Sequence, residues 1–216
     1  MKKISLFLIL SFFTCLSFSQ TRNFKLVKAP TENLTTQKRK AIIIGMSDYG
    51  GGLSLNNTLN DANDMAIVFT QLGFEVTQLT NNDFQSLETN LRNWYKTIER
   101  NDMAVFYYAG HGVQVKGQNY LLPVDFPLEA CEDDVKYKAL NANQVVDNMD
   151  SKQVGFKLII LDACRNNPLK SCSSTRSIET KGLANMNVPL GTYFIYSTAP
   201  GTEAQDGGDL KNGVFT

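Results

Sequence analysis

The sequence has few of the residue types that bind metal ions. His111 is the only histidine in 216 residues, and the four cysteines are Cys15, Cys131, Cys164 and Cys172. The scattered cysteines lack the C-x-x-C spacing that is typical of a zinc site. We therefore predict neither a metal ion nor another cofactor.

The chain also lacks an excess of charge of either sign. Its 21 basic and 21 acidic residues cancel. Proteins that bind nucleic acids or other polyanions rely on excess positive charge, so this balance argues against a nucleic-acid partner. With 43% hydrophobic and 19% charged residues, the composition is that of a globular domain rather than of a disordered chain.

Long hydrophobic runs are scarce as well. One run, residues 4–18, follows two lysines, and small residues occupy positions 17 and 19. It is short for a membrane-spanning helix, and this order of segments is typical of a secretory signal peptide. We expect residues 1–19 to be a signal peptide that is cleaved after Ser19, and the protein to be exported to the periplasm or the medium. No other segment is predicted to span a membrane.

Removal of that segment would leave three cysteines, which is an odd number for an exported chain. At least one thiol is then free or paired with another chain. A disulfide between Cys131 and Cys172 would leave Cys164 free, although the sequence does not determine the connectivity.

Hydrophobic periodicity predicts strands that alternate with helices. Residues 20–38 are polar and read as a flexible leader. Helix 84–98 has Asn82 or Asp83 as its candidate N-cap. The alternation predicts one α/β domain over residues 39–216, with a mostly parallel sheet and helices on both faces. The expected strands are 41–45, 75–79, 103–109, 158–161 and 193–197, the other helices 61–72 and 140–149, and a hairpin lies within 113–124.

Reactive side chains follow two of the buried strands. His111 lies between Gly110 and Gly112 after strand 103–109, and Cys164 follows strand 158–161. Parallel strands bring their carboxyl ends to one edge of the sheet, where binding sites form. A thiol beside an imidazole is a nucleophile beside a base. Either residue alone is more often structural, but together they favour catalysis, with the Gly112 and Cys164 N–H groups as donors to an oxyanion.

The sequence contains the motifs Phe106-Tyr-Tyr-Ala-Gly-His-Gly112, Tyr120-Leu-Leu-Pro-Val-Asp125 and Leu158-Ile-Ile-Leu-Asp-Ala-Cys-Arg165. These three motifs resemble those of the caspase-like cysteine peptidases of clan CD, and within them the bacterial caspase-like proteins and the paracaspases. The resemblance covers residues 38–216. It implies a three-layer α/β sandwich that hydrolyses peptide bonds, with Cys164 as nucleophile and His111 as general acid and base.

The resemblance also implies a substrate. Asp61, Asp162 and Glu203 match acidic positions around the first specificity pocket of the relatives that cut after basic residues. Carboxylates that converge on one pocket favour a guanidinium, so we expect protein or peptide substrates with Arg, or else Lys, at P1. Asp61 has a simpler interpretation as a helix N-terminal charge, and Asp206 is a weaker candidate.

Other segments depart from the family or carry weaker signals. The family has a further strand and helix after the position of Thr216, so we expect the C-terminal elements to be missing. Residues 166–189 resemble a loop that is cut during maturation in some relatives. The acidic segment 129–134 lacks the alternating ligands of a calcium loop, and we expect a solvated turn there. The candidate self-cleavage points are Lys170, Arg176 and Lys181.

Two functions of other classes remain open from the sequence. A caspase-like domain could serve as a non-catalytic interaction module, although the presence of His111 and Cys164 weighs against this. A flavodoxin-like ligand-binding domain would need a glycine-rich phosphate loop after its first strand. Residues 50–52 are three glycines but lack the spacing of a nucleotide fingerprint. The oligomeric state is not predicted.

Overall fold

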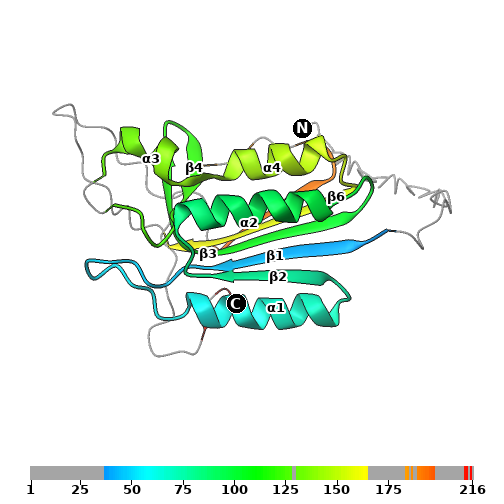
Figure 1. The fold of residues 1–216 in the computed structure, drawn as a ribbon, viewed down its shortest axis with the longest axis horizontal. Coiled ribbons are helices and arrows are strands. Elements are labelled where there is room, and N and C mark those ends of the chain that lie inside the picture. Colours follow the sequence, from blue (N-terminus) through cyan, green and yellow to red (C-terminus); the bar gives the residue numbers. More distant parts are fainter. Residues whose placement is uncertain are drawn as a thin grey trace, which may run out of the picture. The chain divides into compact units, whose positions relative to one another are not determined.

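The chain forms helices and strands in the alternating order that the periodicity predicts (Figure 1). The structure is a computed structural model, and it describes residues 37–127, 130–164, 183–184, 186, 189–197, 212–213 and 215. The elements are β1 (Arg39–Gly45), α1 (Thr58–Gln71), β2 (Glu75–Thr80), α2 (Phe84–Thr97), β3 (Met103–Val115), β4 (Gln118–Leu121), α3 (Glu132–Lys138), β5 (Leu140–Asn141), α4 (Ala142–Ser151), β6 (Phe156–Cys164) and β7 (Thr192–Tyr196).

The sheet is mostly parallel. Strands β2, β1, β3, β6 and β7 are neighbours in that order, and every pairing among them is parallel. The short strands β4 and β5 continue the sheet in antiparallel pairing from the last residues of β3. The central position of β3 explains its composition, because a strand covered on both faces reads as a continuous apolar run.

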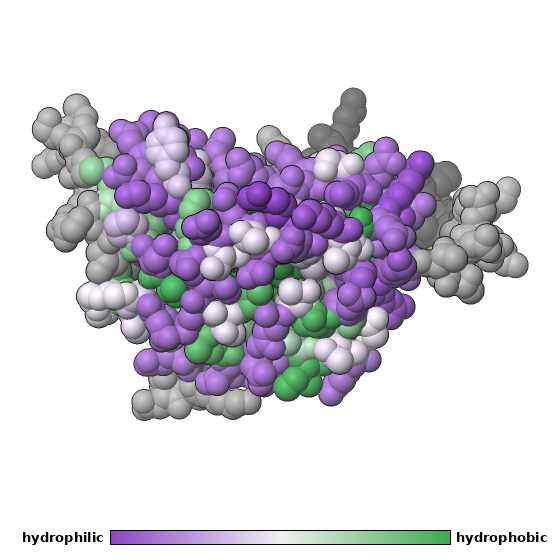
Figure 2. Space-filling view, in the orientation of Figure 1, coloured by the Kyte–Doolittle hydropathy of each residue, from purple (hydrophilic) through white to green (hydrophobic). Residues whose placement is uncertain are grey.

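Helices cover the two faces of the sheet and produce three layers. Ile42, Ile44 and Phe106 point to the face that packs against α2 and α4. Ala41 and Ile43, which alternate with them, point to the face that packs against α1. Figure 1 shows α2 and α4 on one side and α1 near β1 and β2, and the outer surface in this orientation is mostly hydrophilic (Figure 2). The predicted three-layer α/β architecture is confirmed.

The starts of α2 and α1 can be assigned to particular residues. Asp83, one of the two predicted caps, begins α2, and its carboxylate accepts a hydrogen bond from the Ser86 amide at 2.7 Å. That bond lowers the pKa of Asp83. Helix α1 begins at Thr58 rather than at Asp61, so Asp61 lies within its first turn. The hydroxyl of Thr58 donates to the carbonyl of Met46 at 2.8 Å and so ties the helix start to the end of β1.

The structure corrects the interpretation of two segments. Strand β3 does not end at Ala109, because residues up to 111 pair with β6 and residues from 112 pair with β4. The acidic segment 129–134 is not only a solvated turn, because Glu132 begins α3. A carboxylate oxygen of Asp134 accepts from the Cys131 amide at 3.1 Å, which is the contact that starts a helix. Among the residues that the structure describes, no helix is long and apolar enough to cross a membrane.

Candidate active site

The lone histidine lies beside Cys164 in the sheet. His111 and Cys164 are register partners, and they form the last parallel pair between β3 and β6. Neighbouring strands run about 4.8 Å apart, so the backbones of the two residues are adjacent. His111 is buried, with 4% of its surface exposed. The two residues that the sequence predicts to act together are thus brought together by the strand register.

The loop between β1 and α1, residues 46–57, holds the imidazole of His111. Nε2 lies 2.7 Å from the carbonyl oxygen of Leu53, and the ring of Tyr49 packs against the imidazole with centroids 4.5 Å apart. A carbonyl oxygen can only accept, so Nε2 carries the proton and Nδ1 is the acceptor nitrogen of the neutral ring. Gly51 and Gly52 have φ values of 65° and 81°, which let the chain turn between the two contact residues.

Asn81, just after β2, holds the start of this loop. Its side-chain oxygen accepts from the amides of Ser47 and Asp48 at 2.8 and 3.2 Å. The Ser47 hydroxyl donates to the Leu55 carbonyl at 2.5 Å. The loop that contacts His111 is therefore anchored to the sheet and closed on itself.

Gly112 has a packing role that the sequence did not reveal. A Cβ at this position would lie 3.0 Å from the Ala163 Cβ and 3.3 Å from a methyl group of Leu183. Leu183 is buried, and the next residue, Ala184, is held by the side chain of Asn119 in β4. Asn119 donates to the Ala184 carbonyl at 2.8 Å and accepts from its amide at 2.6 Å. Because Gly112 has no side chain, residues 183–184 can pack against the strand next to His111.

Replacing Asn119 by alanine should destabilise the protein. The side chain is fully buried, and its loss leaves the amide and carbonyl of Ala184 without these partners. We expect the free energy of unfolding to fall by about 2–3 kcal/mol, measured by urea denaturation. The control is Asn93→Ala on the exposed side of α2, which should change it by less than about 0.5 kcal/mol. Equal stabilities of the two variants would contradict the assigned role.

Two of the three predicted pocket acids lie close together. Asp61 is buried, with 2% exposed, and its Oδ1 accepts from the Gly213 amide at 2.9 Å. A Cβ at Gly213 would lie 3.1 Å from Asp61 Oδ2 and 3.9 Å from Asp162 Oδ2, so both carboxylates face the same point. The Tyr107 hydroxyl lies 3.5 Å from Asp162 Oδ2. The third predicted acid, Glu203, lies outside the described residues.

Several other sequence predictions also fall outside the described residues, namely Asp206, Lys170, Arg176 and Lys181. Cys131 is disulfide-bonded, but the side chain of its partner is not among those described, so the pairing with Cys172 stays a prediction. Within the described part of the chain, no group of three or more His, Cys, Asp or Glu residues is placed to hold a metal ion.

Sequence reasoning missed Tyr49 and Leu53, which both contact the imidazole. Both lie in the loop that follows β1. Loops at the carboxyl ends of parallel strands form binding sites. This rule identifies the loop after β1 as part of the site, but it does not say which residues of the loop contact His111. Which of them touch His111 depends on the turn at Gly51 and Gly52.

Comparisons with known proteins identify the family to which the chain belongs. The profile of the caspase domain, a peptidase family, matches residues 38–216. The chain belongs to this family. The human protein named mucosa-associated lymphoid tissue lymphoma translocation protein 1 is 26% identical over 188 residues, which make up 86% of this chain and 22% of that protein.

Two further relatives complete the comparison. A probable protease from a Desulfuromonadales bacterium is 27% identical over 128 residues, covering 56% of this chain and 15% of that protein. This caspase-domain chain thus spans less than a quarter of the length of the curated relatives named here. The crystal structure of caspase-1 from Spodoptera frugiperda has a similar fold, with a TM-score of 0.54, 17% identity, and coverage of 78% of this chain and 62% of that one.

Proposed function

We propose that the protein is a cysteine endopeptidase that acts through Cys164 and His111. The observation that carries the proposal is the register of β3 and β6, which makes the two residues neighbours at the carboxyl ends of two central parallel strands. Membership of a peptidase family supports the same reaction. A thiol and an imidazole at adjacent positions are the pair that covalent peptide hydrolysis needs.

The reaction has two steps. In the first, Nδ1 of His111 takes the thiol proton, the Cys164 sulfur attacks the carbonyl carbon, and the negative charge develops on the carbonyl oxygen. The imidazolium then protonates the leaving amine as the C–N bond breaks, which leaves a thioester. In the second step His111 takes a proton from water, and the resulting hydroxide attacks the carbonyl carbon of the thioester. The C–S bond then breaks, the carboxylic acid leaves, and the imidazolium returns its proton to the Cys164 sulfur. The N–H groups of Gly112 and Cys164 are the proposed donors to the oxyanion.

The proposed substrate is a peptide with Arg, or else Lys, at P1. The support is the pair of carboxylates, Asp61 and Asp162, that face one point near Gly213. A guanidinium donates hydrogen bonds to two such carboxylates in fixed geometry, whereas a further negative charge would be repelled. Glu203 stays the third proposed member of this pocket.

The proposed location is outside the cytoplasm. The basic and apolar start of the chain supports export, and so does the disulfide of Cys131, because disulfides persist in oxidising compartments. Intact-mass measurement of the chain from the producing cell should give a polypeptide that starts at Gln20. A start at Met1 in the cytoplasmic fraction would contradict this.

An active-site probe tests the proposed function directly. We expect an arginyl chloromethylketone to alkylate the reduced wild-type protein, and peptide mapping by mass spectrometry to locate the adduct on Cys164. The His111→Ala variant should react far more slowly, and Cys164→Ala should not react at this site. An aspartyl chloromethylketone is the matched control and should label poorly. A folded, reduced protein that no probe labels would instead favour the non-catalytic interaction module.

A further inference from the structure

Two buried tyrosines meet at the backbone of His111. Tyr49 comes from the loop between β1 and α1, and Tyr108 comes from β3. Their hydroxyl oxygens lie 3.1 Å apart, and 4% of Tyr49 and none of Tyr108 is exposed. Two phenol groups placed together inside a core need polar partners, since an unsatisfied buried hydroxyl is costly.

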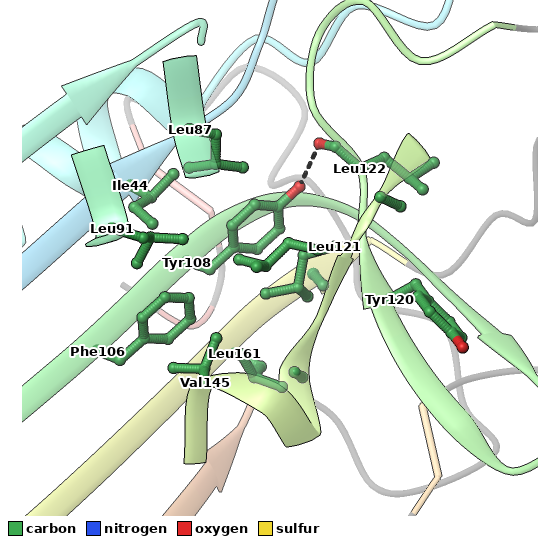
Figure 3. Packing of buried hydrophobic residues seen from close by; sticks show 14 of the residues in the cluster. Ile44, Leu87, Leu91, Phe106, Tyr108, Tyr120, Leu121, Leu122, Val145 and Leu161 are labelled. Atoms are coloured by element: carbon green, nitrogen blue, oxygen red, sulfur yellow. Dashed lines mark hydrogen bonds between the residues drawn. The ribbon is translucent and has the colours of Figure 1, made fainter. Parts of the chain in front are cut away.

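The partners of these hydroxyls are the peptide groups of His111 and Leu122. The His111 amide donates to the Tyr49 hydroxyl at 3.0 Å. The Tyr108 hydroxyl lies 2.9 Å from the His111 carbonyl and 2.8 Å from the Leu122 carbonyl, and Figure 3 draws the latter contact. The Tyr49 hydroxyl lies 3.0 Å from the same Leu122 carbonyl, and the Leu122 amide donates to the His111 carbonyl at 2.9 Å.

Each phenol has one proton to donate, and one consistent arrangement forms a ring. The His111 N–H donates to Tyr49, Tyr49 donates to Tyr108, and Tyr108 donates to the carbonyl of His111 itself. Successive bonds of this kind polarise one another in a low-dielectric interior. Both peptide groups of His111 are therefore held by the two hydroxyls, and this sets the direction from which its side chain leaves the strand.

The glycine before the histidine makes room for this pair. A Cβ at Gly110 would lie 2.6 Å from the Tyr108 hydroxyl oxygen and 2.7 Å from that of Tyr49. Real Cβ atoms do not approach oxygen atoms so closely. The two hydroxyls thus occupy the space that any side chain at Gly110 would need. A glycine is therefore required before His111 as long as both tyrosines are present.

The imidazole depends on the same residues. The ring of Tyr49 packs on the ring of His111, and Leu53, close to Tyr49 in the same loop, accepts from Nε2. If the His111 backbone or Tyr49 shifts, the Nε2 contact lengthens, and the proton can move to Nδ1. The tyrosine pair thus controls both the place and the tautomer of the ring.

We propose that Tyr49 and Tyr108 are positioning residues for His111, with Gly110 as the residue that admits their hydroxyl groups. The proposal rests on the proposed function in one respect only, namely that the positioned imidazole is the catalytic base. Neither tyrosine is proposed to touch the substrate.

The single histidine makes the positioning measurable without activity. In a protein uniformly labelled with ¹⁵N and carrying no polyhistidine tag, a long-range ¹H–¹⁵N spectrum contains one imidazole. At a pH at which the ring is neutral, we expect the wild type to show a protonated Nε2 and an unprotonated Nδ1. Tyr49→Phe and Tyr108→Phe should each show averaged nitrogen shifts, because the ring samples both tautomers.

Catalytic measurements give the second readout. Each variant should lose about tenfold in kcat, the size expected for one hydrogen bond, with KM little changed because the pocket acids are untouched. Tyr120→Phe is the matched control. Tyr120 is also buried, its hydroxyl contacts Gln118 at 3.2 Å, and Figure 3 shows it directed away from Tyr108. It should keep the wild-type spectrum and kcat.

The outcomes separate the two proposals. Wild-type nitrogen shifts in both folded Tyr→Phe variants would overturn the positioning role, whether or not the protein hydrolyses peptides. Shifted spectra in variants of a protein that lacks all activity would support the positioning role and contradict the proposed function. Gly110→Ala should disturb the spectrum most, but the two phenylalanine variants are the decisive ones, because each removes a single oxygen atom.

Discussion

Alanine in place of Cys164 is expected to abolish peptide hydrolysis, with kcat for an arginyl substrate lower by roughly 10⁵- to 10⁶-fold. In the proposed mechanism the Cys164 sulfur forms the covalent bond to the substrate, which the alanine side chain cannot do. His111→Ala should lower kcat to a similar extent because the thiol would lose its proposed base, the residue paired with Cys164 in the register of β3 and β6. Fluorogenic peptide assays, with active-site titration to exclude contaminating peptidases, provide the measurement.

The double variant Cys164→Ala/His111→Ala shows whether the two residues act together in catalysis or contribute independently. Residues that act as a unit show strongly non-additive effects, so the double variant should be no slower than either single variant. Thermal unfolding must remain cooperative in all three. A His111→Ala variant that keeps most of its activity in a folded protein would contradict the proposed dyad.

Asparagine in place of Asp61 or Asp162 should remove the preference for arginine. Each substitution keeps the size of the side chain but removes one charge from the point that the two carboxylates share. A hydrogen bond between charged groups contributes about 1.5–3 kcal/mol, so kcat/KM for an arginyl substrate should fall about 10- to 100-fold. The measurement is the ratio of kcat/KM for two peptides that differ only in arginine or citrulline at P1.

Citrulline has nearly the shape of arginine without its charge, so this ratio reports the carboxylates and not a general loss of folding. The wild type should strongly prefer arginine, and each asparagine variant should prefer it much less. Asp147→Asn, on an exposed part of α4, is the matched control and should keep the wild-type ratio. Unchanged ratios in both pocket variants would place the P1 site elsewhere.

The sequence predicted the fold from patterns that depend on local chemistry. A strand covered on both faces must be apolar throughout, and residues 103–109 have that composition. The apolar face of α1, with Ala62, Ala66 and Phe69, follows from helical spacing. The Gly-His-Gly and Ala-Cys-Arg sequences then identified the two residues that the sheet brings together. These patterns are enough to predict the fold, because each one depends only on residues that are close together in the sequence.

The contacts around His111 were not predictable in the same way. Tyr49, Leu53 and Leu122 reach the histidine from two separate loops, and nothing in their own neighbourhoods indicates that they meet. The sequence predicts a solvated turn at the acidic start of α3, because charged side chains favour contact with water. The pairing of Asp61 with Asp162 was suggested by family resemblance, and their common direction toward Gly213 follows only from the packing of α1 against the sheet.

The chain by itself thus determined the layers, the order of strands and helices, and the two residues proposed as the catalytic pair, because apolar periodicity and motif chemistry are local properties. Tertiary structure alone decided which ring nitrogen of His111 carries the proton and why Gly110 has no side chain. Both depend on the distance between a loop and a strand that lie far apart in sequence, and such distances are set by the packing of the whole domain.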